Sequence, residues 1–175
     1  MRFGSKAAWV LCFVWCAWLT AGQVFLREVC GPWTPDLGLV LVTGLVICSG
    51  RAASLGLVYC LVATRLATSL EPPAALLAGG WLAFLLARSV AQVLDRGQAL
   101  ARSGAAFGGA LLMGLWVAFA RHLNAEQVLG RGAMVDFWPL ALEALMTAAA
   151  SGLCALVIGH WLVRLPGLSP LRRQP

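Results

Sequence analysis

Charged side chains are scarce in this sequence. Asp, Glu, Lys and Arg together account for 11% of the 175 residues, whereas apolar residues account for 61%. A soluble globular domain carries about 25% charged and 45–50% apolar residues. The composition therefore excludes an ordinary soluble domain and indicates an integral membrane protein, with room for one compact bundle of helices.

Long basic runs are absent as well. The formal net charge is +6, but the basic residues are scattered, and the longest run of them is the pair Arg172 and Arg173. A protein that binds nucleic acid needs a basic face to contact the phosphates. We therefore expect no nucleic-acid partner, and we interpret the positive charge as a topology signal.

The usual signatures of catalysis and metal binding are missing. The six cysteines form no CxxC pair, and neither histidine is placed to complete a zinc site with them. The sequence contains no HExxH, GxSxG or Walker motif, and no predicted span contains an aspartate. We therefore expect no enzyme activity, no cofactor and no metal, and we expect the cysteines within apolar runs to pack as small apolar residues.

What the sequence does contain is a series of apolar runs of membrane-spanning type. We predict a single domain of six transmembrane helices, at about residues 7–26, 37–50, 52–70, 74–94, 103–120 and 138–163. The first run is long and rich in tryptophan, which favours a retained span over a cleaved signal peptide. The second run is short, so either the preceding Pro-Trp-Thr-Pro segment extends it or the bilayer thins around it.

The second and third runs are joined only by Ser49, Gly50 and Arg51, which predicts a tight hairpin with its turn on one side of the membrane. If the N-terminus is cytoplasmic, nine basic residues fall on the inner side and three on the outer side. Arg51, Arg96 and Arg102 are the topology-setting residues in the inner loops. The sequence thus predicts a multi-pass protein of the bacterial cytoplasmic (inner) membrane, with both termini in the cytoplasm.

Two charged residues, Arg65 and Glu143, lie well inside predicted spans. Each is five residues from the outer end of its span, so both are expected at one depth in the outer half of the membrane. Opposite charges at one depth can form an intramembrane ion pair, which offsets part of the cost of burying them. Two alternatives are that each side chain reaches the outer headgroups separately, or that the pair binds a substrate.

The layout resembles the rod shape-determining protein MreD family of bacteria. The resemblance lies in Pro35-Asp36 opening an apolar run, a basic turn at Arg51, and small residues at Gly56 and Cys60. It implies an all-α bundle similar to the substrate-binding subunits of energy-coupling-factor transporters. It also implies a non-catalytic scaffold that packs against the membrane helix of an MreC-like protein, beside RodA and a transpeptidase. Such a scaffold maintains cell shape and organises peptidoglycan synthesis during elongation.

The third span departs from that family pattern, because MreD-like sequences commonly have an acid near its end and this chain has Thr64 and Arg65. Two other functions stay open: a substrate-capture subunit of a vitamin transporter, or an orphan small transporter. The interior of the bundle distinguishes a scaffold from a capture subunit. A scaffold should be filled with apolar side chains, whereas a capture subunit should contain a polar cavity that opens outward.

Overall fold

The structure is a computed structural model that describes residues 5–49, 51–69, 71–93, 99–129 and 137–172. Within these ranges the regular structure is helical, and they contain no strand. The elements are α1 (Ser5–Cys30), the short 3₁₀ helix η1 (Gly31–Trp33), α2 (Leu37–Cys48), α3 (Arg51–Thr68), α4 (Pro73–Val93), α5 (Ala99–Leu129), α6 (Phe137–Val157), α7 (Gly159–Leu162) and α8 (Ser169–Arg172).

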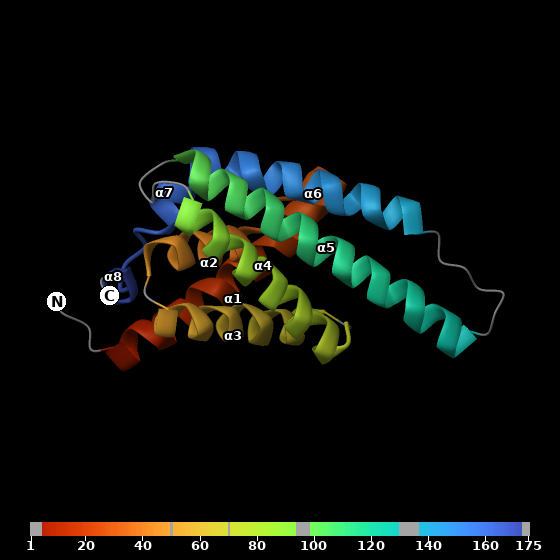
Figure 1. The fold of residues 1–175 in the computed structure, drawn as a ribbon, viewed down its shortest axis with the longest axis horizontal. Coiled ribbons are helices and arrows are strands. Elements are labelled where there is room, and N and C mark those ends of the chain that lie inside the picture. The colour runs from red at the N-terminus through yellow and green to blue at the C-terminus, as the bar shows by residue number, and fades with distance from the viewer. Residues whose placement is uncertain (1–4, 50, 70, 94–98, 130–136, 173–175) are drawn as a thin grey trace.

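Helices α1 to α6 run back and forth along the long axis of the molecule (Figure 1). The start of α1 and helix α8 lie at the same end, together with the end of α2 and the starts of α3 and α5. The α3–α4 turn, the end of α5 and the start of α6 lie at the other end. Among the described residues, α1, α4, α5 and α6 are each long and apolar enough to cross a membrane, while α2 and α3 are shorter apolar helices. The predicted helical fold of membrane type is therefore confirmed, and four of the six predicted spans have the length that crossing requires.

Helix α2 lies at the centre of the bundle. Every residue from Gly38 to Ile47 is buried, and the helix contacts α1, α3, α4, α5, α6 and α7. A helix that is apolar on all sides is stable when protein or lipid surrounds it, and here other helices do. Its 12 residues span about 18 Å. The Pro-Trp-Thr-Pro segment does not lengthen α2, because Asp36 caps its first turn. The interior of the bundle therefore sets the length of this helix.

Several helix ends differ from the predicted spans. Helix α1 continues past residue 26 to Cys30, where Gly31 turns the chain at a φ of +57° that favours glycine. Helix α5 begins four residues earlier than predicted and continues to Leu129, although a loop was expected from Arg121. Helix α6 ends at Val157 rather than 163. Hydropathy marks where the apolar part of a helix ends, and a helix with polar residues can extend beyond that point.

Small residues bring α5 close to α6. A Cβ atom added to Gly114 would lie 2.8 Å from the Cβ of Ala144, and one added to Gly152 would lie 3.1 Å from the Cβ of Phe107. The hydroxyl of Ser103 also donates to the carbonyl of Gly152 at 2.8 Å. Such small residues allow helix backbones to approach closely where lipid surrounds the bundle.

The cysteines within helices behave largely as predicted. Cys12 and Cys16 are fully buried in the apolar core, and the Cys12 thiol lies within hydrogen-bonding reach of Cys16 and Cys60. The described residues contain no group of His, Cys, Asp and Glu side chains arranged to hold a metal ion.

Candidate functional site

A cavity of about 260 Å³ opens among the helices, lined by the end of α3, the start of α4 and the start of α6. Its wall combines the second half of α1, η1, the segment before α2, the end of α3, the start of α4, the middle of α5 and the start of α6. Three arginines and three acids contribute to this wall: Arg27, Arg65, Arg121, Asp36, Glu71 and Glu143. Such a set of charges within an otherwise apolar bundle marks a candidate functional site.

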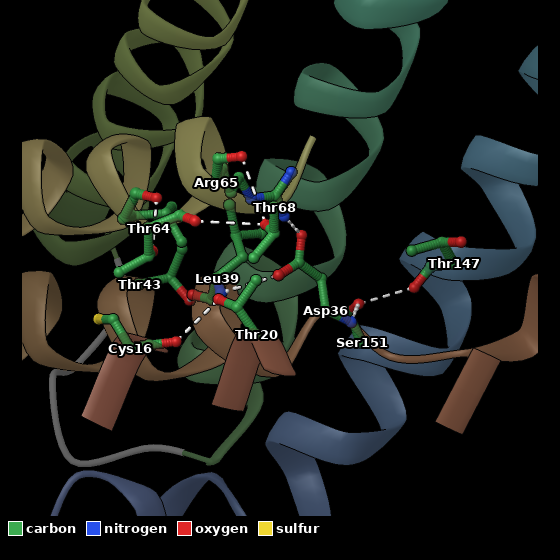
Figure 2. Close-up of polar contacts among 11 residues, drawn as sticks. Cys16, Thr20, Asp36, Leu39, Thr43, Thr64, Arg65, Thr68, Thr147 and Ser151 are labelled. Carbon is green, nitrogen blue, oxygen red and sulfur yellow. Dashed lines mark hydrogen bonds and ion pairs between the residues drawn. The ribbon is translucent and has the colours of Figure 1, made fainter. Parts of the chain in front are cut away.

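Asp36 and Arg65 form the most buried of the ion pairs. The Nη2 group of Arg65 contacts Oδ2 of Asp36, and the two side chains are 20% and 8% exposed, respectively. Asp36 also caps α2, because its Oδ1 accepts from the backbone N–H of Leu39 at 3.0 Å. Figure 2 shows the guanidinium of Arg65 beside this carboxylate. One carboxylate therefore starts the central helix and holds the end of α3 against it.

The backbone of Asp36 is held by α6. Its N–H donates to the hydroxyl of Ser151 at 2.8 Å, and this hydroxyl donates to the carbonyl of Thr147 at 2.7 Å (Figure 2). The hydroxyl of Thr147 in turn donates to the carbonyl of Pro32 at 3.1 Å. These bonds fix the segment between α1 and α2 against α6, and they satisfy polar groups that would be costly to leave unpaired in the interior.

Two further ion pairs lie nearer the surface of the cavity. Arg27, in the last turn of α1, pairs with Glu143 of α6, with 63% and 36% of these side chains exposed. Arg121 of α5 pairs with Glu71 in the α3–α4 turn, with Nε 2.5 Å from Oε1. Their exposed fractions are 47% and 12%. Each pair joins parts of the chain that are far apart in sequence, so together they tie the helix ends around the cavity.

The predicted ion pair between Arg65 and Glu143 is wrong. Both side chains line the cavity, but Arg65 contacts Asp36 and Glu143 contacts Arg27. The prediction placed Asp36 and Arg27 in a loop outside the bundle. Instead, the short α2 starts inside the bundle, so that Asp36 is only 5% exposed, and the longer α1 carries Arg27 as far as Glu143.

Two of the three predicted topology residues, Arg51 and Arg102, lie near the starts of α3 and α5, at the other end of the bundle. Arg51 begins α3, although its side chain is outside the described part, and Arg96 lies outside the described residues altogether. Arg102 is in the first turns of α5, and its buried Nε has no hydrogen-bond partner among the described residues. Arg88 donates to the carbonyl of Ser49 at 3.4 Å and so contacts the end of α2.

The cavity offers hydrogen-bonding groups and apolar surface together. Its hydroxyl-bearing residues are Thr20, Thr34, Thr68, Ser69 and Thr147. The Ser69 hydroxyl is buried and has no hydrogen-bond partner within the described ranges. The apolar part of the wall comes mainly from Leu76, Met113, Val117 and Leu140. A concave site that combines polar groups with apolar surface is typical of small-molecule binding sites.

Sequence reasoning identified two of the six charged residues of the cavity as candidate site residues. The predicted spans leave Arg27, Glu71 and Arg121 in loops, and Asp36 enters the prediction through the family resemblance alone. One signal was available for Asp36, because an aspartate directly before an apolar run is a typical helix N-cap and therefore points to an ordered position. The ion pairs of Arg27, Glu71 and Arg121 depend on tertiary packing, so the sequence pattern carries no signal for them.

No known protein family, curated protein or solved structure matches this chain. The resemblance to the MreD family, and the likeness to energy-coupling-factor subunits that it implies, therefore remain predictions from the sequence pattern.

Proposed function

We propose that this protein is a membrane-embedded binding subunit that captures a small polar molecule in its cavity, as the substrate-capture component of a transport system. The cavity between α1 and α6 carries the proposal, because it combines three ion pairs and several hydroxyls with an apolar wall. Charge is costly to place inside a membrane protein, so charges that line a cavity favour a binding role in addition to the structural one.

We further propose that the chain crosses the bacterial inner membrane six times with both termini in the cytoplasm. The alternating direction of α1 to α6 supports this topology, as does the excess of basic residues in the sequence segments predicted on the inner side. The central α2 would then cross while surrounded by other helices. In this orientation the cavity opens to the outer side, where a capture subunit meets its substrate.

We also propose that the protein acts by binding rather than by catalysis. Among the described residues of the cavity, each acid is held by an arginine, and no acid forms the pair with serine, cysteine or histidine that activates a nucleophile. Paired charges of this kind suit recognition of a polar molecule, because their donors and acceptors are fixed in place before it arrives.

Thermal unfolding of the purified protein in lipid nanodiscs, screened against small polar metabolites, tests capture directly. A ligand present at about 100 times its Kd should stabilise the folded protein by about 2.7 kcal/mol. The control is Thr147→Trp, which places a large side chain in the cavity. If no compound raises the melting temperature, or if the wild type and Thr147→Trp respond equally, the proposal is rejected.

A second candidate is the MreD-like scaffold of the cell-elongation complex. The observation that favours it is the exposed apolar face of α1, the least buried of the four long apolar helices, on which Trp18 and Phe25 are each 73% exposed. The membrane helix of an MreC-like protein would fit such a face. Because lipid also covers apolar faces, this face supports the scaffold less strongly than the cavity supports capture.

Depletion of the protein followed by microscopy, with co-purification of an MreC-like partner, distinguishes the two candidates. Loss of rod shape together with recovery of that partner would favour the scaffold. Normal cell shape after depletion, together with no MreC-like partner in the purification, would exclude the scaffold.

A further inference from the structure

The deep end of the cavity has more free hydrogen-bond donors than acceptors. Both carboxylate oxygens of Asp36 are engaged, Oδ1 by the N–H of Leu39 and Oδ2 by Arg65. Arginine has five N–H donors in a rigid planar arrangement. Within the described part of the chain, the ion pair with Asp36 occupies the Nη2 group of Arg65, which leaves Nε and Nη1 as donors. A ligand group that binds here must therefore accept hydrogen bonds.

Ser69 adds a second donor beside Arg65. Its backbone N–H donates to the carbonyl of Arg65 at 2.8 Å, so the last turn of α3 continues through Ser69 and places it on the same face as Arg65. Its hydroxyl is buried, lines the cavity and has no hydrogen-bond partner among the described residues. A buried hydroxyl without a partner is costly, and a ligand that accepts from it would remove that cost.

Part of the cavity wall is apolar. Leu76 is 2% exposed and Met113 is also 2% exposed, and both line the cavity together with Val117 and Leu140. A ligand that matches this lining has a hydrogen-bond-accepting group and an apolar body. The volume of about 260 Å³ restricts it to a small molecule.

Building on the capture function proposed above, we propose that the ligand is a small organic oxyanion with an apolar body, whose carboxylate or phosphate binds Arg65 and Ser69. A guanidinium matches the geometry of both oxyanions and binds them through charge-assisted hydrogen bonds. Asp36 remains on Arg65 as the partner that holds the guanidinium in position. A cationic ligand would instead have to displace Arg65 from Asp36.

The test measures binding of four matched probes to the full chain in nanodiscs by thermal shift: benzoate, phenyl phosphate, benzamide and benzylamine. Benzoate or phenyl phosphate should stabilise the protein, and whichever of the two binds more tightly identifies the oxyanion. Benzamide has nearly the shape of benzoate without its charge, and benzylamine reverses the charge. Both should therefore fail to stabilise the protein.

Two variants test whether Arg65 and Ser69 bind the ligand. Arg65→Lys keeps a cation beside Asp36 but loses the planar donors, so it should weaken oxyanion binding about tenfold. Ser69→Ala removes a hydroxyl that has no partner in the described part of the protein, so folding should be preserved while binding weakens roughly fivefold. The matched control is Arg88→Lys at the other end of the bundle, which should leave binding unchanged.

Equal stabilisation by benzoate and benzamide, or stabilisation by benzylamine, would overturn the oxyanion proposal. So would unchanged binding in both Arg65→Lys and Ser69→Ala. If the four probes fail but the metabolite screen finds a neutral or cationic ligand, the oxyanion proposal falls and the capture function stands. If the screen also finds nothing, both fall.

Discussion

Asp36 connects three helices through separate contacts. Its Oδ1 caps α2, its Oδ2 pairs with Arg65 of α3, and its backbone N–H donates to Ser151 of α6. At 8% exposure the side chain of Asp36 is shielded from water, so its partners must supply the interactions that water would otherwise provide. We therefore expect this position to be among the most sensitive in the chain.

The substitution Asp36→Asn tests the buried ion pair alone, because asparagine also caps helices well. It leaves the charge of Arg65 without a partner in the interior, and removing one member of a buried pair costs about 3–5 kcal/mol. Thermal unfolding of the purified protein should show a large drop in melting temperature.

The control for Asp36→Asn is Glu143→Gln, whose ion pair with Arg27 is far more exposed. An exposed pair contributes about 0–1 kcal/mol, so this variant should unfold close to the wild type. Equal melting temperatures for the two variants would contradict the structure at this site.

At the scale of elements, the α5–α6 contact depends on small side chains. Gly114 and Ala144 meet where the two helices cross, and both residues also line the cavity. Any enlargement here must push the helices apart, because the neighbouring atoms include the Cα of Ala144, 3.4 Å from an added Cβ. The helix crossing therefore controls both stability and the shape of the cavity.

Gly114→Ala should destabilise the protein by about 1–3 kcal/mol through overpacking. Gly104→Ala, on the same helix, is the matched control, because an added Cβ there has no atom within 4 Å. Since alanine forms helix more readily than glycine, this control should be neutral or raise stability by up to about 1 kcal/mol. If Gly114→Ala unfolds like the control, α5 and α6 do not cross at this point.

The sequence was sufficient to predict the helices but not how their ends meet. Apolar runs identify helices because burial and lipid contact both require them, and α1 to α6 all begin within a few residues of a predicted span. The helix ends shifted where polar residues continue a helix, as at Arg27 and Arg121. Sequence periodicity could not predict the cavity, because Arg27 and Glu143 are 116 residues apart and meet only through tertiary packing.

The two ends of the whole molecule differ in their residues. The charged cavity is lined by the end of α3 and the start of α6, at one end of the bundle, while the starts of α1 and α5 lie at the other. In a membrane these two ends face different compartments. The orientation of the protein in the membrane can therefore be measured without any knowledge of the ligand.

The native cysteines allow that measurement. Cys30, the last residue of α1, is exposed at the cavity end, whereas Cys12 and Cys16 are buried. A membrane-impermeant maleimide added to intact cells or spheroplasts should label the wild type but not Cys30→Ser. An N-terminal tag should be accessible only after permeabilisation. Labelling of Cys30 that also required permeabilisation would reverse the proposed topology.

The most direct test of the central proposal is whether water reaches the cavity through the membrane-embedded part of α6. Thr147 lines the cavity about 15 Å from the start of α6, whereas Leu145 lies nearer that start, is 46% exposed and is absent from the cavity wall. Cysteines introduced at these two positions, in a Cys30→Ser background, would be treated from outside with a charged thiol reagent that reacts only in water. The account predicts rapid modification of Thr147→Cys and little of Leu145→Cys, although Thr147 is the deeper of the two. Faster modification of Leu145→Cys, or none of Thr147→Cys, would contradict an outward-open binding cavity.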